Sequence, residues 1–88
     1  QNSPNPFNPC TVIAFDVPVG TEGKVSLKVF DLRGRLQNTL LEGAMQPGRH
    51  AVFWNGRDRN GQELPSGVYL YRLSVPGWSQ TRKMVLLR

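Results

Sequence analysis

The residue types that usually carry enzyme or metal chemistry are sparse in this chain. It has 88 residues, with a single cysteine, Cys10, and a single histidine, His50. A structural zinc site takes four cysteine or histidine ligands and an internal disulfide takes two cysteines, so the composition excludes both. His50 lies within a strand-like pattern, and neither Ser66 nor Ser74 has an acid-base relay beside it. We therefore expect no enzyme activity, no metal and no cofactor.

One loop invites a calcium interpretation. Asp58, Asn60 and Gly61 lie in the polar segment NGRDRNGQELPSG that follows Trp54. The EF-hand pattern needs further acidic ligands and a closing glutamate, which this segment lacks. Two Asn-Gly pairs and a Pro-Ser-Gly are typical of turns, so the sequence favours a polar hairpin loop.

Aromatic residues give another candidate chemistry, the stacking of a sugar ring. Trp54 is in phase with Val52 and is predicted to lie in the core. Trp78 follows a Pro-Gly turn and is predicted to lie at the rim of the domain. Trp78 is therefore the residue we expect to be free for contact with a ligand.

Charge and length limit the classes of partner. Eleven Lys and Arg residues against six Asp and Glu give a formal charge of +5, which suits nucleic acid, an anionic glycolipid or an acidic protein. The basic residues are scattered along the chain and no helix is predicted that could enter a groove, so nucleic acid is excluded as a partner. No apolar run approaches the roughly 20 residues of a membrane span, and the first residues lack a signal-peptide layout.

Alternation of period two recurs along the chain and predicts β-strands. The run 66–77 reads as a central strand, and 81–88 is expected to return beside it as the second strand of a hairpin. The strands 10–17, 24–31 and 49–55 are predicted in the same way. The run 35–42 suits either a short strand or one helical turn, and the flanking glycines favour a strand. The predicted inward-facing residues are Thr11, Ile13, Phe15, Val17, Val25, Leu27, Val29, His50, Val52, Trp54, Tyr69, Tyr71, Leu73 and Val75.

Two parts of the chain differ in character. Residues 1–9 contain the proline-rich run SPNPFNP and are predicted to form a stiff strap or linker. Residues 10–88 hold six or seven strands separated by turn residues, which indicates an all-β, immunoglobulin-like antiparallel β-sandwich.

Four segments in register carry a resemblance to a known family. They are PNPFNP, KVSLKVFDLRGR, GRHAVFWNGRDRNGQELPSGVYLYRL and TRKMVLLR, and together they cover nearly the whole chain. The chain resembles the type A C-terminal sorting domain of proteins exported by the type IX secretion system. The same segments are similar to the immunoglobulin-like domain of the flagellar hook-capping protein.

The resemblance implies a precursor with a secretion signal, a passenger domain such as a hydrolase or adhesin, and this module at its end. Its partners would be the type IX secretion machinery with its sortase-like protease, that passenger, and an anionic lipopolysaccharide at the cell surface. The protein would be secreted or held at the cell surface, via the periplasm of a Gram-negative bacterium. The resemblance assigns recognition to Gly67, Tyr69, Arg72, Gly77, Lys83, Met84, Val85, Leu86, Leu87 and Arg88.

The last strand itself has two physical interpretations. A strand paired on one side only offers free backbone groups to a receptor, and Lys83 and Arg88 flank an apolar run that could fill a pocket. Alternatively, either Met84 and Leu86 or Val85 and Leu87 simply complete the sandwich.

Three functions therefore stay open at this point. The first is a noncatalytic sorting module read through its last hairpin. The second is a structural or assembly domain of the hook-cap type, in which the tail has no special role. The third is an accessory carbohydrate-binding module that uses Trp78.

Overall fold

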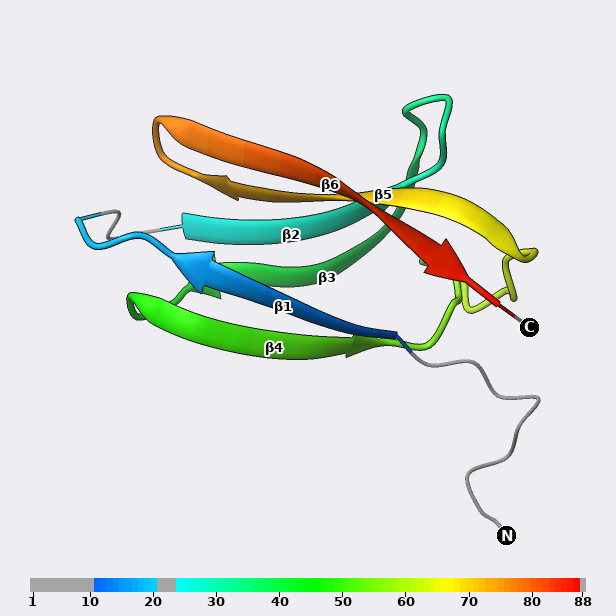
Figure 1. The fold of residues 1–88 in the computed structure, drawn as a ribbon, viewed down its shortest axis with the longest axis horizontal. Coiled ribbons are helices and arrows are strands. Elements are labelled where there is room, and N and C mark those ends of the chain that lie inside the picture. Colours follow the sequence, from blue (N-terminus) through cyan, green and yellow to red (C-terminus); the bar gives the residue numbers. More distant parts are fainter. Residues whose placement is uncertain (1–10, 21–23, 88) are drawn as a thin grey trace, which may run out of the picture.

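The structure is a computed structural model, and it describes residues 11–20 and 24–87. These residues form six β-strands (Figure 1), with no helix among them and hence none that could cross a membrane. The strands are β1 (Thr11–Val17), β2 (Lys24–Phe30), β3 (Leu36–Ala44), β4 (Gly48–Trp54), β5 (Gly67–Val75) and β6 (Trp78–Leu86). The predicted strap over residues 1–9 and Cys10 lie outside the described residues.

The strands form two sheets, and every pairing is antiparallel. One sheet has the order β1-β4, and the other has the order β3-β2-β5-β6. The two sheets enclose one apolar core, which confirms the predicted all-β, immunoglobulin-like sandwich. β5 lies between β2 and β6, so the prediction that the run 66–77 is a central strand is also confirmed.

The core consists of the residues that alternate inward along each strand. Nothing polar or charged is buried among the described residues. Of the predicted inward residues, Thr11, His50, Val52 and Tyr71 are half-buried and the other ten are buried. The buried set is Ile13, Phe15, Val17, Val25, Leu27, Val29, Trp54, Tyr69, Leu73, Val75, Met84 and Leu86.

Two strands differ from the prediction in extent. β3 is a strand, as favoured, but it runs to Ala44 and pairs with β2 through two register shifts. Those shifts put Leu40 and Leu41, which are adjacent in sequence, both against the core. β6 begins at Trp78 rather than at residue 81, because the Pro76-Gly77 turn has only two residues and pairs Val75 directly with Trp78. Gly77 has φ of +80°, which favours glycine at this turn.

Candidate functional site: the β6 edge

β6 is an edge strand, and this is the feature on which its candidate role depends. All nine of its residues pair with β5, from Val75↔Trp78 to Gly67↔Leu86. On its other side no strand of the described part pairs with it, as Figure 1 shows. One row of backbone N–H and C=O groups is therefore open to a partner.

The turn fixes which backbone groups face outward. A two-residue turn makes its flanking pair, Val75 and Trp78, a hydrogen-bonded pair, and such pairs then alternate with non-bonded ones along the hairpin. Counting from the turn, the β6 residues of the non-bonded pairs direct their N–H and C=O groups away from β5. They are Ser79, Thr81, Lys83 and Val85.

The apolar end of β6 divides between two faces. Met84 and Leu86 are 9% and 0% exposed and belong to the core, whereas Val85 and Leu87 are 56% and 75% exposed. The alternative in which Met84 and Leu86 complete the sandwich is therefore the one the structure has. No partner can contact these two side chains without opening the core, and the accessible residues of the expected tail patch are Lys83, Val85 and Leu87. Arg88 lies outside the described residues.

The remaining candidates on the hairpin lie at separate places. Tyr69 is buried, its hydroxyl donates to the carbonyl oxygen of Pro65 at 2.7 Å, and its ring meets Trp54 edge-on at 5.5 Å between centroids. These contacts give Tyr69 a structural role. Gly67 begins β5 opposite Leu86, and Gly77 forms the turn at the other end of the hairpin.

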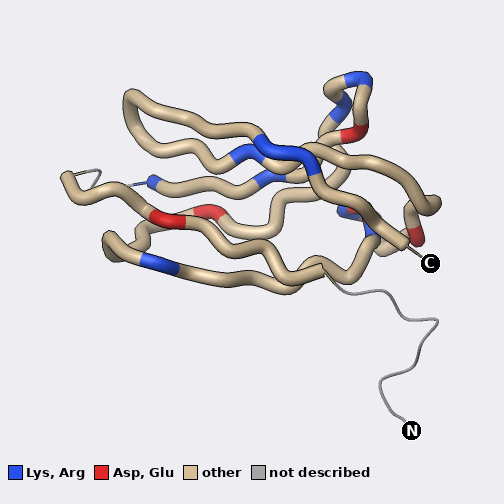
Figure 2. Tube along the Cα trace, viewed as in Figure 1, with Lys and Arg blue, Asp and Glu red and all other residues tan. Residues whose placement is uncertain are grey.

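Arg72 lies on the outer face of the larger sheet, with its guanidinium 4.9 Å from the Phe30 ring centroid. Its Nε donates to Thr81 Oγ1 at 3.2 Å, and its direct neighbour on β2 is Lys28. Lys83, two residues along β6 from Thr81, is on the same face. Figure 2 shows basic positions on the adjacent strands β2, β5 and β6. Like charges placed directly opposite each other destabilise a sheet, so Lys28 and Arg72 do not stabilise their strand pair through their charges.

Trp78 lies on the inner face of β6 and lines a groove of about 390 Å³. The smaller sheet has two strands against four, so it leaves the first half of β6 uncovered: Trp78, Gln80 and Arg82 are exposed, while Met84 and Leu86 on the same face are buried. Opposite them, β1 contributes Ala14 and Asp16 to the groove. Trp78 is 42% exposed, as predicted for a residue at the rim.

Sequence reasoning missed the neighbours of Trp78 in this groove. Tyr71 lies opposite Arg82, and Arg49 on β4 lies 3.8 Å from Asp16 between Nε and Oδ1. The signal was present: a two-residue turn sets the hairpin register, and that register places Gln80 and Arg82 in phase with the buried residues. Two polar residues at core-phase positions indicate a face that the domain itself does not cover.

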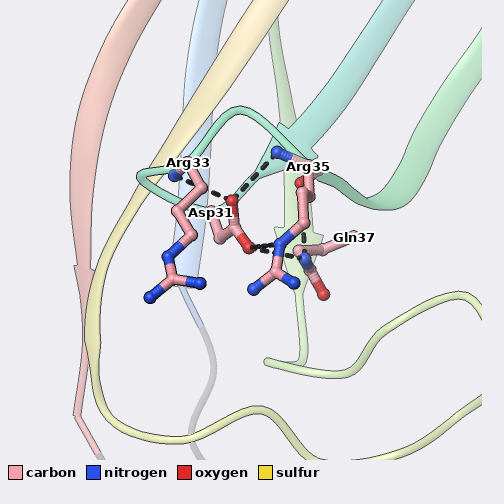
Figure 3. Close-up of polar contacts among 4 residues, drawn as sticks. All are labelled: Asp31, Arg33, Arg35 and Gln37. Atoms are coloured by element: carbon pink, nitrogen blue, oxygen red, sulfur yellow. Dashed lines mark hydrogen bonds and ion pairs between the residues drawn. The ribbon is translucent and has the colours of Figure 1, made fainter.

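The turn at residues 31–34 is held by one carboxylate (Figure 3). Asp31 Oδ1 accepts the backbone N–H groups of Arg33 and Arg35, both at 2.9 Å, and Oδ2 accepts Arg35 Nε at 2.8 Å and Gln37 Nε2 at 3.2 Å. The Arg35 backbone N–H, with lesser help from the Arg35 side chain and the Arg33 N–H, holds the pKa of Asp31 below its ordinary value. Both oxygens are occupied by the turn, so Asp31 acts in structure and not in acid-base chemistry.

The loop once considered for calcium is also organised by its own backbone. Asp58 Oδ1 accepts the N–H groups of Asn60 at 2.9 Å and Gln62 at 3.0 Å, as in an Asx turn. Trp54 Nε1 donates to the carbonyl oxygen of Arg57 at 3.0 Å and ties this loop to the core. In the described part of the chain no three His, Cys, Asp or Glu side chains come together as a metal site would require.

Comparison with known proteins agrees with this architecture. The model of a family described as the FlgD Ig-like domain matches residues 11–80, which is most of the chain. The chain belongs to the FlgD Ig-like domain family. The family match ends within β6, so the exposed residues Lys83, Val85 and Leu87 lie beyond the matched segment.

The FlgD Ig-like fold is also found in a solved structure, that of dimeric latent PorU from Porphyromonas gingivalis. The two are 27% identical with a TM-score of 0.65, and the match covers 93% of this chain and 8% of the PorU chain. The domain therefore corresponds to a small part of a much larger protein in that case. In the comparison with curated proteins nothing matches.

Proposed function

We propose that this domain is a noncatalytic C-terminal sorting module that directs a secreted passenger through the outer membrane by the type IX secretion system. The observation that carries the proposal is the free edge of β6, which ends in the exposed residues Lys83, Val85 and Leu87. A receptor strand that adds to this edge would gain main-chain hydrogen bonds, and the exposed side chains would add specificity. The passenger would then be attached at the cell surface or released.

Two further observations support the proposal. The resemblance to the sorting family includes the closing TRKMVLLR segment, which lies entirely outside the FlgD Ig-like match. The PorU comparison supports the idea of an appended module, because the same fold occupies only 8% of that chain. A module of this size with a modest core suits a role as a recognised surface rather than as a catalyst.

Family membership favours one alternative, a structural or assembly domain. In that role the two sheets would pack between subunits, and the β6 edge would have no special part. The two functions differ in one expectation: only the sorting module should lose its activity when the exposed end of β6 is altered without damage to the core.

The test is an export assay with a matched control. The 88 residues are placed behind a secretion signal and a fluorescent reporter in a bacterium with a type IX system, and surface and medium fluorescence are measured. Deletion of residues 83–88 also removes Met84 and Leu86 from the core, so the informative variant is the double substitution Lys83→Gln with Val85→Gln. The control is Lys24→Gln with Val12→Gln, because Lys24 is exposed like Lys83 and Val12 has the same 56% exposure as Val85.

We expect the β6 variant to stay in the periplasm and the control to be exported like the parent. Equal export of both variants would reject the sorting function and favour the assembly domain. Equal loss in both would point to general sensitivity of the fold and would also count against recognition at β6.

A further inference from the structure

We propose that the groove beside Trp78 reads the side chains of the strand that docks on β6, and that it selects an extended partner segment with an acidic residue four positions before an apolar one. The inference rests on the proposed function in taking β6 as the docking strand. It adds the chemistry of the partner.

The groove lies where an added strand would send its side chains. A strand paired to the free edge of β6 alternates its side chains between the outer face of the larger sheet and the inner face. On the inner face its residues would lie beside Trp78, Gln80 and Arg82, which line the groove. The opposite wall is β1, which has β4 as its only sheet neighbour in the described structure. The groove is thus open along a strand edge on both walls, which suits an extended peptide.

One end of the groove is aromatic. Trp78 supplies this aromatic surface and is 42% exposed, whereas Tyr71 lies opposite Arg82 at the other end. An apolar side chain placed here would cover the exposed part of the indole and gain the free energy of that burial.

The other end is cationic. Arg82 is exposed and takes part in none of the ion pairs among the described residues, which are Asp31–Arg35, Asp16–Arg49 and Arg57–Glu63. Asp16 pairs with Arg49 at 3.8 Å, with both side chains more than 70% exposed, so that pair is weak, and Asp16 forms no ion pair with Arg82. Of the charged residues that line the groove, Arg49 and Arg82 are basic and Asp16 is acidic. The unmatched charge is therefore positive and calls for a carboxylate.

The register sets the order of the partner's residues. Trp78 and Arg82 are four residues apart on β6, so their partner positions on a docked strand are also four apart. An antiparallel strand meets Arg82 first and Trp78 last, and antiparallel pairing is the more stable arrangement. The preferred segment therefore has the carboxylate on its N-terminal side.

The test uses capped seven-residue peptides and isothermal titration calorimetry on the full 88-residue chain. The probe has aspartate at position 2, leucine at position 6 and threonine elsewhere. One control peptide has asparagine for aspartate, another has the aspartate and leucine exchanged, and a short oligogalacturonate represents an anionic sugar.

The probe is expected to bind, and loss of its carboxylate or exchange of the two residues should each weaken binding about tenfold, as for loss of a charge-assisted hydrogen bond. Arg82→Gln should weaken binding of the probe about tenfold and leave binding of the asparagine control peptide unchanged. The effects of removing the arginine and of removing the carboxylate would then not be additive. Trp78→Ala should also weaken the probe, while Lys24→Gln, on β2 and outside the residues that line the groove, should stay within about twofold. Trp78 and Arg82 are both exposed, so these variants should fold.

Binding of the oligogalacturonate with no binding of the probe would overturn the inference, as would equal affinity for the probe and either control peptide. The export assay separates this outcome from failure of the proposed function. If export depends on Lys83 and Val85 while the probe does not bind, the sorting function stands and the groove inference fails. If the probe binds as described while export ignores β6, the groove is a peptide site without a role in sorting.

Discussion

Leu86→Ala and Val85→Ala should differ sharply in stability although the residues are adjacent. Leu86 has no exposed surface and lies in the core, whereas Val85 is 56% exposed on the outer face. Truncation of a buried leucine costs about 2–5 kcal/mol through lost burial and the cavity left behind. Truncation of an exposed valine costs within about 0.5 kcal/mol.

These magnitudes matter against the total stability. A domain of this size has a free energy of unfolding of about 4–13 kcal/mol, so Leu86→Ala removes a large share of it. With a urea dependence of about 1.5 kcal/mol per M, the unfolding midpoint should fall by about 1.3–3.3 M for Leu86→Ala and by less than about 0.4 M for Val85→Ala. Emission of the buried Trp54 reports the transition. Similar midpoint shifts for the two variants would refute the assignment of alternate residues of β6 to the core and the surface.

The difference in stability between Leu86→Ala and Val85→Ala also decides which of the two variants is informative in the export assay. A variant that loses export because it is unfolded says nothing about recognition. Val85→Ala that folds normally and still loses export would locate the effect at the exposed side of β6, whereas Leu86→Ala confounds folding with recognition.

Three further changes test other parts of the structure. Gly77→Ala should lower the free energy of unfolding, measured with urea, by about 1–2 kcal/mol, because φ is +80° at this position. No atom within 4 Å would obstruct a Cβ, so the cost comes from the backbone conformation alone. An unchanged free energy of unfolding would mean that the turn has another conformation. Lys28→Glu should raise the free energy of unfolding by about 0.2–1 kcal/mol, because it places an opposite charge beside Arg72. A lower free energy of unfolding would contradict the pairing of residues 28 and 72. Folding lowers the pKa of Asp31, so its contribution to the free energy of unfolding is present above its unfolded pKa and is lost as the pH falls through its folded pKa. Below about pH 4 the parent should therefore lose more stability than Asp31→Asn. Identical dependence of stability on pH in the two proteins would count against the hydrogen bonds at residues 31–35.

The fold class could be predicted from the sequence because apolar and polar residues alternate regularly along most strands. Val25, Leu27 and Val29 are each 0% exposed, as their period-two pattern predicted. β3 was harder, since its leucines suited either a strand or one helical turn, and the register shifts that bring Leu40 and Leu41 both against the core depend on pairing with β2. The start of β6 was placed too late because Ser79, Gln80 and Thr81 are polar on both faces, a pattern that resembles a loop until the hairpin register is known.

The candidate site was only partly predictable, for a physical reason. Sequence gave the edge-forming hairpin and the exposed Trp78, but it left open which side of the last strand meets the core, because Met84, Val85, Leu86 and Leu87 are all apolar. That choice is made by the register with β5, in which Met84 lies opposite the buried Tyr69. The groove depends on the number of strands in each sheet, which the sequence indicates only indirectly, through the polar residues Gln80 and Arg82 at core-phase positions.

The most direct test of recognition at the β6 edge compares export of Val85→Pro with export of Val85→Thr. Proline removes one outward-facing backbone N–H without touching the ladder with β5, whereas threonine keeps the N–H and the branched shape and removes only apolar surface. With both variants shown to be folded by urea unfolding, we expect the proline variant to be retained in the periplasm and the threonine variant to be exported. Export of the folded proline variant at the parent level would contradict recognition through this edge.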